Sequence, residues 1–326
     1  MKVALITPAR LGSRSGNSMT AVRWASILRH LGCKISLSHE FNGESVDIMI
    51  ALNAYRTANS IQKFRQQYPE RPLVVALTGT DLYRFLNSHP EQTRGSIEAA
   101  DRLVVLNNLA HNVLSPDQRR KCFVILESAA PLPNGRRLLI RNFDVCVIGH
   151  LRPEKDPLRT AQAARRLPAS SKIRVRHYGK AHTNEWTEAA QEEMVYNPRY
   201  TWFGEVPHWQ IRRVLARSRL MVLSSNIEGG PNCLSEAIVA GLPVITTNID
   251  GCVGVLGPDY PGYFPVGDTT VLCEQLTRAE NDALFLAKLE KFILNIAPRF
   301  AREEEQDRWA TLLWELFDSK SKGREI

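Results

Sequence analysis

The chain has 326 residues, of which 44% are hydrophobic and 23% are charged, and its net charge is +8 at pH 7. These proportions exclude an intrinsically disordered chain, and the length suits two domains of ordinary size. The basic surplus favours anionic partners, such as nucleic acid, acidic lipid or phosphorylated small molecules, without choosing among them. The six cysteines form neither a CxxC pair nor a cluster with zinc spacing, so we expect reduced thiols and no metal site.

The first residues, MKVALITPARLG, contain one lysine and a short apolar run. This pattern predicts a strand, because a signal peptide needs a longer apolar region and a cleavage site. No apolar run approaches the roughly 20 residues that a membrane-spanning helix requires. We therefore expect a cytoplasmic protein without integral membrane contact.

Short runs rich in Val, Ile and Leu alternate with longer segments of helical period through the first half of the chain. The runs lack polar alternation, which predicts strands that are fully buried in a parallel sheet. They cover residues 2–7, 34–38, 47–51, 72–77, 102–106 and 122–125. Between the first two runs, residues 18–31 place apolar side chains at three- and four-residue steps, and Gly32 then ends the helix. Repeated β-α units predict a doubly wound, Rossmann-like sheet.

The sequence PLPNG at residues 131–135 is a linker by composition, and the same alternation restarts after it. Further strands are predicted at residues 143–148, 173–178, 200–203, 220–223 and 244–246. We expect an N-terminal Rossmann-like domain over residues 1–135 and a second one over residues 136–299, with a ligand cleft between them. Residues 300–326 are predicted to form an amphipathic helix that packs across both domains, since its acidic polar side argues against membrane attachment.

The strongest motif is EGGPNCLSE at residues 228–236, which follows a predicted strand. Gly229 and Gly230 allow backbone N–H groups to approach a ligand closely, and Pro231 suits the first position of a helix. The helix that begins at Asn232 then offers its N-terminus to an anion.

Two glutamates bracket this turn, eight positions apart. A carboxylate accepts two hydrogen bonds from a vicinal diol, the recurring group of ribose and of hexoses. Glu236, inside the helix, would suit the ribose, and Glu228, ahead of it, would suit the sugar. The alternative is a glycine-rich turn with two solvated glutamates.

A second motif, GHLRPEKD, occupies residues 149–156 and directly follows another predicted strand. It places Arg152 and Lys155 at the carboxyl end of that strand. Two cations there can neutralise a diphosphate and stabilise the charge that develops on a departing nucleotide.

Together these motifs resemble those of retaining glycosyltransferases of the GT-B family 4, and the resemblance covers the whole second domain. It implies a GT-B fold and a UDP-sugar donor, with residues 202–207 beside the uracil. By the family pattern, Glu228, Arg152 and Lys155 are also catalytic. The residues assigned to the UDP-sugar are Gly16, Arg152, Lys155, Glu228, Gly229, Gly230, Pro231, Asn232 and Glu236. No Asp-x-Asp motif occurs at the expected donor site, so neither a metal nor a cofactor is predicted.

The predicted acceptor site lies in the first domain. The loop after its first strand is rich in glycine and serine at a helix N-terminus, which makes an anion nest with added arginine charge. Arginines also follow the third and fourth strands. Four arginines at the carboxyl ends of parallel strands suggest a small, highly charged acceptor. The predicted acceptor-binding residues are Arg10, Ser13, Arg14, Ser15, Asn17, Arg56, Thr78, Gly79, Thr80 and Arg84.

Many members of the glycosyltransferase family have a histidine where this chain has Leu77 or Thr78. A hydroxyl acceptor is commonly helped by a base, whereas an acceptor that is ionised at neutral pH needs none. Asp81 is the remaining catalytic candidate in that loop. It could orient a sugar hydroxyl or assist a water, or it could be only the N-cap of the following helix.

Three stretches of the first domain resemble the selenosugar synthases of selenoneine biosynthesis: TPARLGSRSGNSMTAVRWA, FRQQYPERPLVVALTGTDLYRFL and ADRLVVLN. This resemblance implies transfer of N-acetylglucosamine or glucose from its UDP-sugar to selenophosphate. The product is a 1-seleno-sugar with a carbon–selenium bond, formed with loss of UDP and phosphate. The resemblance also implies a functional link to the enzyme that forms selenoneine.

Two other functions remain open. A GT-B glycosyltransferase acting on a sugar or lipid hydroxyl would need an apolar or sugar-shaped acceptor site instead of arginines. A non-catalytic nucleotide-sugar-binding protein would bind UDP-sugar and never release UDP. Nucleic acid is not an expected partner, because the basic residues are spread along the chain without a nucleic-acid-binding motif.

Overall fold

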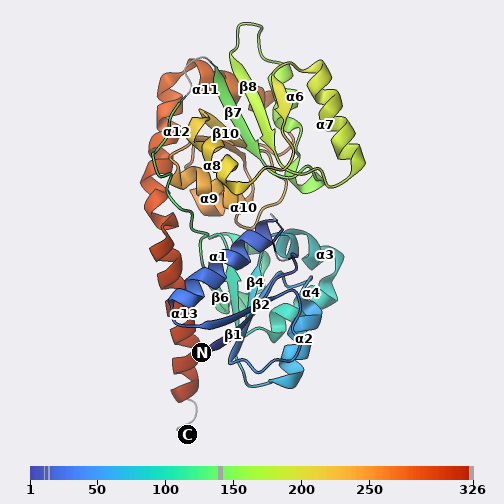
Figure 1. Cartoon of the computed structure of the whole chain (residues 1–326), viewed down its shortest axis with the longest axis vertical. Helices are drawn as coiled ribbons and strands as arrows, with labels where there is room; N and C mark the ends of the chain where they lie inside the picture. Colours follow the sequence, from blue (N-terminus) through green and yellow to red (C-terminus); the bar gives the residue numbers. More distant parts are fainter. Residues whose placement is uncertain (11, 14, 139–141, 323–326) are drawn as a thin grey trace. The chain divides into compact units, whose positions relative to one another are not determined.

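The computed structural model describes residues 1–10, 12–13, 15–138 and 142–322. They form two compact units. The first comprises Met1–Glu127, Glu228–Asn232 and Arg302–Ile326, and the second comprises Ser128–Ile227 and Cys233–Ala301. Each unit contains one sheet of six strands (Figure 1), which confirms the predicted α/β architecture of two doubly wound, Rossmann-like sheets. The predicted domain boundaries and the packing of the last helix across both domains stay predictions.

The sheet of the first unit is wholly parallel, with the strand order β2-β1-β3-β4-β5-β6. Its strands are β1 (Lys2–Ile6), β2 (Lys34–Ser38), β3 (Ile48–Leu52), β4 (Leu73–Leu77), β5 (Arg102–Val105) and β6 (Cys122–Val124). The central strands β3 and β4 are buried along their whole length, as expected. The expectation of full burial is wrong for β2 and β6, because both are edge strands with a single neighbour.

Helices cover both faces of this sheet (Figure 1). Alternate strand residues such as Val3 and Leu5 share a core with helices α1 and α13, whereas Ala4 and Ile6 share a core with α2 and α4. The helical elements are α1 (Gly16–His30), α2 (Ala58–Gln67), the π-helix η1 (Asp81–Phe85), α3 (Leu86–Ser88), α4 (Pro90–Ala99), η2 (Ala110–Val113), α5 (Pro116–Arg120) and α13 (Arg302–Lys322).

The sheet of the second unit is also parallel, with the order β12-β11-β10-β7-β8-β9. Its strands are β7 (Phe143–Ile148), β8 (Ile173–Tyr178), β9 (Tyr200–Trp202), β10 (Leu220–Leu223), β11 (Val244–Thr247) and β12 (Tyr263–Phe264). The sequence pattern does not predict β12, which has only two residues and therefore no periodicity to recognise.

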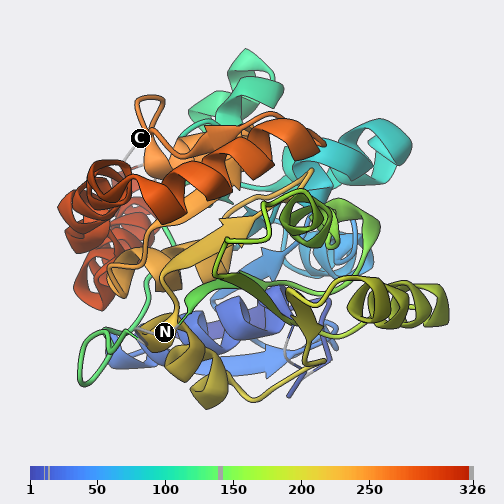
Figure 2. The same cartoon turned by 90° about the horizontal axis from the view of Figure 1, so that it is seen from above.

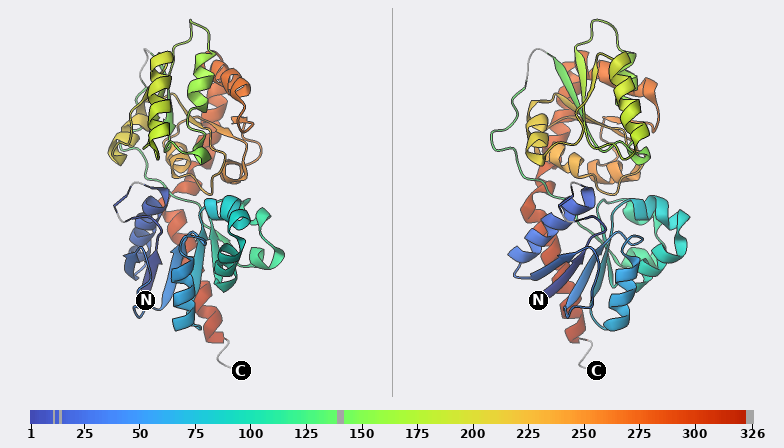
Figure 3. Two further views of the ribbon diagram at one scale, coloured as in Figure 1. Left: turned by 90° about the vertical axis from the view of Figure 1, so that its right-hand side faces the viewer. Right: turned by 45° about the vertical axis from the view of Figure 1, so that its right-hand side comes forward.

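Helices flank this second sheet as well (Figures 2 and 3). They are η3 (Pro153–Lys155), α6 (Arg159–Arg165), α7 (Asn184–Tyr196), α8 (His208–Arg217), α9 (Asn232–Val239), α10 (Asp250–Leu256), α11 (Thr269–Asn281), α12 (Ala283–Ile296) and η4 (Ala297–Phe300). None of the described helices combines the length and the apolar character needed to cross a membrane.

Each sheet has one point at which the strand order reverses. The reversal lies between β1 and β3 in the first unit and between β7 and β10 in the second. In open α/β sheets, ligands bind outside the carboxyl ends of the strands at such points. The loops that follow these four strands are therefore the places to look for a site in each unit.

Candidate active site

The loop after β7 carries the two cations of the second sequence motif. It contains η3 and ends at Asp156, which has a φ of 41° although it is not glycine. Nε of Arg152 is buried and has no hydrogen-bond partner among the described residues, and Oε2 of Glu154 lies 4.0 Å from it. A buried cationic donor without a close partner is costly unless an anion meets it. This geometry fits the predicted contact between Arg152 and a diphosphate.

The loop after β7 carries the acidic Glu154 and Asp156 beside its two cations, and His150 lies near its start. The ring of His150 lies 5.2 Å from that of His182. Burial first, and then the charges of His182, Arg152 and Lys155, lower the pKa of His150 to about 4, against an opposing effect of Glu205. His150 is therefore neutral near pH 7, and the positive charge of the loop comes from Arg152 and Lys155.

Hydrogen bonds fix the loop after β10 against the loop after β7. Oγ of Ser224 donates to the carbonyl oxygens of Lys155 and Asp156, at 3.2 and 2.9 Å. The backbone N–H of Asn226 donates to the carbonyl oxygen of Glu154 at 2.9 Å. The two loops at the strand-order reversal of the second sheet thus hold each other in place, which preorganises the cations.

Glu236, the predicted ribose ligand, lies on α9 and has a histidine partner. Nε2 of His208, the first residue of α8, is 2.8 Å from Oε1 of Glu236. The side chain of Glu236 is 18% exposed and that of His208 is 46% exposed. The hydrogen bond to Glu236 raises the pKa of His208, against a smaller opposing effect of burial. One carboxylate oxygen is therefore held, and the other can face a ligand.

The segment predicted to border uracil begins at the end of β9. Nε1 of Trp202 donates to the carbonyl oxygen of Gly179 at 2.8 Å, and the ring of Phe203 stacks on that of Tyr178 at 4.9 Å. A Cβ at Gly179 would lie 1.9 Å from the carbonyl oxygen of Gly149, so only glycine fits there. Phe203 is 42% exposed and offers an aromatic surface, while contact with uracil stays a prediction.

The glycine-rich turn belongs to the first unit, although the chain on either side of it belongs to the second. A Cβ at Gly229 would lie 2.5 Å from the backbone N of Gly79 and 2.7 Å from the carbonyl oxygen of Thr78. A Cβ at Gly230 would lie 2.5 Å from Cβ of Leu106. From the sequence, we expect these glycines to allow the close approach of a ligand. In the structure, the loops of the first unit make the close approach.

Further contacts hold the turn. The fully buried Asn107 donates from Nδ2 to the carbonyl oxygen of Gly229 at 2.6 Å, and its Oδ1 accepts the backbone N–H of Leu109. Glu228 is only 9% exposed, and Pro231 is buried directly before α9. The first glutamate of the motif is thus not a solvated side chain.

Asn232, at the start of α9, takes part in a buried charge cluster that the sequence analysis did not single out. NH1 of Arg23 donates to Oδ1 of Asn232 at 2.6 Å, NH2 donates to Oε1 of Glu127 at 2.8 Å, and Nε donates to Oε2 of Glu305 at 2.9 Å. Thr20 donates to the same oxygen of Glu127 and accepts from Nδ2 of Asn232. These side chains occupy the amide of Asn232, so a ligand contact there would come from the backbone.

The loop after β1 carries the predicted anion nest. Arg10 is exposed, and its carbonyl oxygen accepts the backbone N–H of Ser13 at 3.0 Å. Oγ of Ser13 lies 3.2 Å from Oγ of Ser15, which caps α1 by accepting the backbone N–H of Ser18. Gly16 and Asn17 open the helix, and its first turn has no acidic residue. Arg14, another predicted acceptor ligand, lies outside the described residues.

A set of hydrogen bonds made by the side chains of Asn53 and Asp81, here called the brace, joins the loops after β3 and β4. Asn53 has a φ of 72°, and its Nδ2 donates to Oγ1 of Thr78 at 3.0 Å and of Thr80 at 3.1 Å. The carboxylate of Asp81 accepts the backbone N–H groups of Thr78 at 2.8 Å and of Ala54 at 3.0 Å. A left-handed non-glycine residue and a π-helix side by side are typical of functional sites.

Asp81 is fully buried within this brace. Burial raises its pKa to about 6, although the backbone N–H groups that it accepts lower it. The reading of Asp81 as an N-cap is wrong, because it is the first residue of η1 and its carboxylate also joins the neighbouring loop. These contacts favour a role in holding the loops over direct contact with substrate.

Two of the predicted acceptor arginines converge on one aromatic ring. The guanidinium carbon of Arg56 lies 5.7 Å from the ring centroid of Phe85, and that of Arg84 lies 5.6 Å from it. The rings of Tyr55 and His89 pack close to Phe85, at 4.3 and 5.7 Å. Both arginines are exposed, so the structure brings their charges together beside the braced loops.

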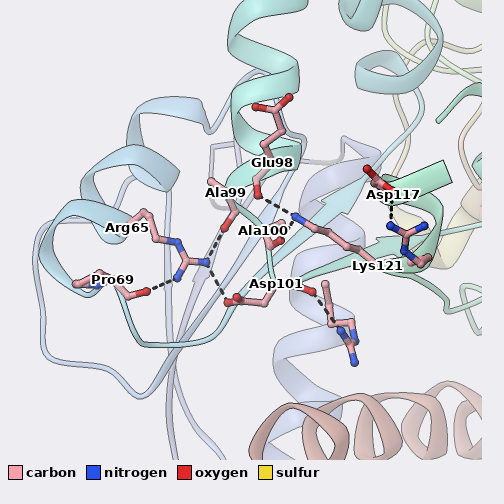
Figure 4. A pocket seen from close by; sticks show the side chains of 10 residues that line it. Arg65, Pro69, Glu98, Ala99, Ala100, Asp101, Asp117 and Lys121 are labelled. Carbon is pink, nitrogen blue, oxygen red and sulfur yellow. Dashed lines mark hydrogen bonds and ion pairs between the residues drawn. The ribbon is translucent and has the colours of Figure 1, made fainter. Parts of the chain in front are cut away.

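A hollow of about 850 Å³ in the first unit is lined by none of these residues (Figure 4). Arg65 and Lys121 cross it, and they donate to the carbonyl oxygens of Ala99 and Ala100. Asp101 lies directly before β5 and accepts the backbone N–H of Leu73. This hollow is therefore at the amino ends of the strands, opposite the loops that carry the predicted site.

Arg23, Asn53 and His208 are not among the site residues predicted from the sequence. The partners of Arg23 and His208 are 28 or more positions away along the chain, so no local motif marks them. Asn53 did carry a signal, because asparagine after a buried strand tolerates the left-handed conformation better than most residues do.

Residues 139–296 match the family model of glycosyl transferases group 1. The putative teichuronic acid biosynthesis glycosyltransferase TuaC of Bacillus subtilis (strain 168) is 32% identical over 82 residues. That match covers 25% of this chain and 21% of TuaC, so the chain matches about a fifth of the length of this curated relative.

Solved structures resemble almost the whole chain. HepE of Anabaena, in complex with UDP-glucose, has a TM-score of 0.78 at 14% identity, over 97% of this chain and 100% of that one. Sucrose-phosphate synthase of Thermosynechococcus elongatus has a TM-score of 0.78 at 15% identity, over 98% and 99%. The chain therefore has the GT-B fold of glycosyltransferases, and its residues 139–296 carry the match to glycosyl transferases group 1.

Proposed function

We propose that the protein is a glycosyltransferase that uses a UDP-sugar, and that its acceptor is selenophosphate. The observation that carries the donor half of the proposal is the buried, unmatched Nε of Arg152 in the loop at the strand-order reversal of the second sheet. A diphosphate oxygen supplies the hydrogen-bond acceptor that this Nε lacks, and Lys155 in the same loop adds a second cation. HepE, a structure of the same fold, binds UDP-glucose.

The remaining donor contacts follow from the chemistry of each residue. Glu236 takes the ribose diol, because His208 holds only one of its oxygens. Glu228, which is nearly buried, takes a hydroxyl of the sugar. Arg152, Lys155 and the N-terminus of α9 stabilise the negative charge that moves onto UDP as it leaves.

The acceptor half is supported by charge and by the burial of Asp81, the base that the sequence suggests. Arg56 and Arg84 sit together beside Phe85, and the loop after β1 adds Arg10 and hydroxyl donors at the start of α1. Asp81, the candidate base, is fully buried and accepts backbone N–H groups. Such a site suits a small polyanion whose nucleophile is already ionised.

The proposed reaction has two steps. An electron pair of selenium forms a bond to the anomeric carbon, while the bond from that carbon to the diphosphate oxygen breaks and its electrons leave with UDP. Water then attacks phosphorus, the selenium–phosphorus bond breaks, and the products are inorganic phosphate and a 1-seleno-sugar. No oxidant or reductant is consumed. All six cysteines are free thiols, which suits a reducing compartment such as the cytoplasm.

The test is release of UDP from UDP-N-acetylglucosamine or UDP-glucose, with and without selenophosphate, under anaerobic conditions. Mass spectrometry identifies the product. Release that depends on selenophosphate, with selenium bound to the sugar, supports the full proposal. Release with sugar or lipid hydroxyls instead would overturn the acceptor assignment, and binding without any release would make the protein a nucleotide-sugar-binding protein.

Variants test the donor site directly. Arg152→Ala should lower kcat by about 100-fold, since it removes a donor to the departing diphosphate. The matched control is Arg120→Ala, because Arg120 is an exposed arginine paired with Asp117 and far from the loop in sequence. Equal activity of the two variants would contradict the role of Arg152.

A further inference from the structure

His208 is the only described residue that the structure pairs by a hydrogen bond with the side chain of Glu236. Nε2 and Oε1 are 2.8 Å apart, and the two residues come from different helices, α8 and α9. The pair lies on the second unit alone, so its geometry is independent of how the two units are arranged.

The position of His208 is a poor one for a cation. It is the first residue of α8, and the residue before it, Pro207, offers no side-chain cap. The partial positive charge of a helix N-terminus disfavours a protonated histidine. Stability of α8 therefore gives no reason for this histidine, whereas a carboxylate within hydrogen-bond distance does.

The charges that act on His208 come from two elements. Glu236, on α9, favours the protonated ring by its hydrogen bond and its charge. Arg212, on α8 itself, opposes it. The guanidinium of Arg212 is held away by the carbonyl oxygens of Ala130 and Pro131. The balance raises the pKa of His208, so the pair is ionic in slightly acidic solution and loses its charge as the pH rises.

We propose that His208 is a positioning residue for the donor: it holds one oxygen of Glu236 so that the other oxygen accepts from the ribose diol. This inference rests on the proposed function, which assigns Glu236 to the ribose. Because a protonated His208 fixes the carboxylate most firmly, donor affinity is highest when His208 is charged. Donor affinity then falls as His208 loses its proton.

The experiment measures the dissociation constant of UDP-glucose by calorimetry, from about pH 5.5 to about pH 8.5. UDP-glucose is the probe because its diphosphate has no group that titrates in this range. For the unaltered protein, we expect the affinity for UDP-glucose to weaken by about threefold to tenfold as the pH rises. This is the change in affinity that the loss of one hydrogen bond causes. In His208→Gln, which cannot titrate, the pH dependence should disappear.

A second probe separates ribose recognition from a general charge effect. UDP-glucose without the ribose 2′- and 3′-hydroxyls should bind more weakly and with little pH dependence. His30→Gln is the matched control, because His30 is an exposed histidine at the end of α1 and should leave the pH profile unchanged. In His208→Gln the KM for UDP-glucose should rise by a larger factor than kcat falls, since the residue acts on binding.

The outcomes are distinct. A pH profile that is the same in His208→Gln, or that persists with the dideoxy probe, overturns the role of His208 and leaves the proposed function standing. No binding of UDP-glucose at any pH overturns the proposed function and this inference with it.

Discussion

Asp81 has no exposed surface, and burial raises its pKa to about 6. In an unfolded chain an aspartate titrates near 3.8. The folded protein therefore holds more protons than the unfolded chain between these values. It follows that the free energy of unfolding falls as the pH rises through this window.

We expect this fall to be on the order of 3 kcal/mol from about pH 4 to about pH 6 for the contribution of Asp81. Asp81→Asn does not titrate, so its unfolding free energy should lack this component. Urea unfolding at several pH values, followed by hydrogen exchange in β3 and β4, measures it. Asp117→Asn, at an exposed position, is the control. The prediction is contradicted if the unfolding free energy changes with pH by the same slope in the unaltered protein, in Asp81→Asn and in Asp117→Asn.

Gly79 is a second residue whose identity the structure dictates. Its φ is 107°, and a Cβ there would lie 2.5 Å from the backbone N of Gly229. Because backbone atoms cannot give way as a flexible side chain can, we expect Gly79→Ala to destabilise the first unit by about 2 kcal/mol or more. Thermal unfolding measures the change.

Gly95→Ala is the opposite case. Gly95 lies inside α4, and a Cβ there would meet no atom within 4 Å. We expect that substitution to stabilise the protein by about 0.5 to 1 kcal/mol, as alanine does in an open helical position. If Gly79→Ala and Gly95→Ala lost similar amounts of stability, the contact with Gly229 would not be the cause of the loss in Gly79→Ala.

At the scale of elements, Arg23 connects three parts of the chain that are far apart in sequence. It lies on α1, and its guanidinium binds Glu127 after β6, Asn232 at the start of α9, and Glu305 on α13. The side chains of both glutamates are almost fully buried. Oε2 of Glu127 has no hydrogen-bond partner among the described residues, so this oxygen depends on the nearby charge of Arg23.

Arg23→Ala should cost about 3 to 5 kcal/mol of stability, because it leaves two buried carboxylates without their cation. Urea unfolding gives the value. Arg302→Ala serves for comparison, since Arg302 is exposed on α13 and donates to Oγ of Ser26. That variant should change stability by less than about 0.5 kcal/mol. A small effect of both would mean that the glutamates are protonated and need no partner.

Most elements could be predicted from the sequence. Strands β7, β8 and β10 have the predicted bounds, and β10 is the unbroken apolar run that is typical of a buried parallel strand. The bounds of the edge strand β2 also agree with the prediction, and only the expectation that it is fully buried is wrong. The attachment of Glu228–Asn232 to the first unit could not be predicted, since it depends on atoms about 120 or more positions away, among them the side-chain amide of Asn107.

At the scale of the whole molecule, donor and acceptor functions should be separable by mutation. Arg56→Ala and Arg84→Ala should raise the KM for selenophosphate by about tenfold or more, since each removes a cation from the predicted acceptor site. The KM for the UDP-sugar should not change. Added salt should raise the KM for selenophosphate in the unaltered enzyme more than in either variant.

Steady-state kinetics with each substrate varied in turn measures both constants. Arg120→Ala should behave as the unaltered enzyme, because Arg120 is exposed beside the hollow at the amino ends of the strands. Parallel changes in both KM values would indicate a structural effect and would contradict the division of roles. The chemical motifs predicted which residues to test, but not the ring of Phe85 that gathers the two arginines.

The pairing of α1 with α13 has a consequence for synthesis on the ribosome. Trp24 and Trp309 have no exposed surface and their rings lie 4.8 Å apart, yet α13 follows the entire second unit in the chain. The first sheet is complete once β6 has emerged, but the face that holds Trp24 has no cover until α13 has been translated. Domains usually fold in the order of their synthesis. Here the first unit is translated first but completes its folding last, after α13 has been made. Until then, the nascent chain must avoid aggregation through the exposed apolar face that holds Trp24.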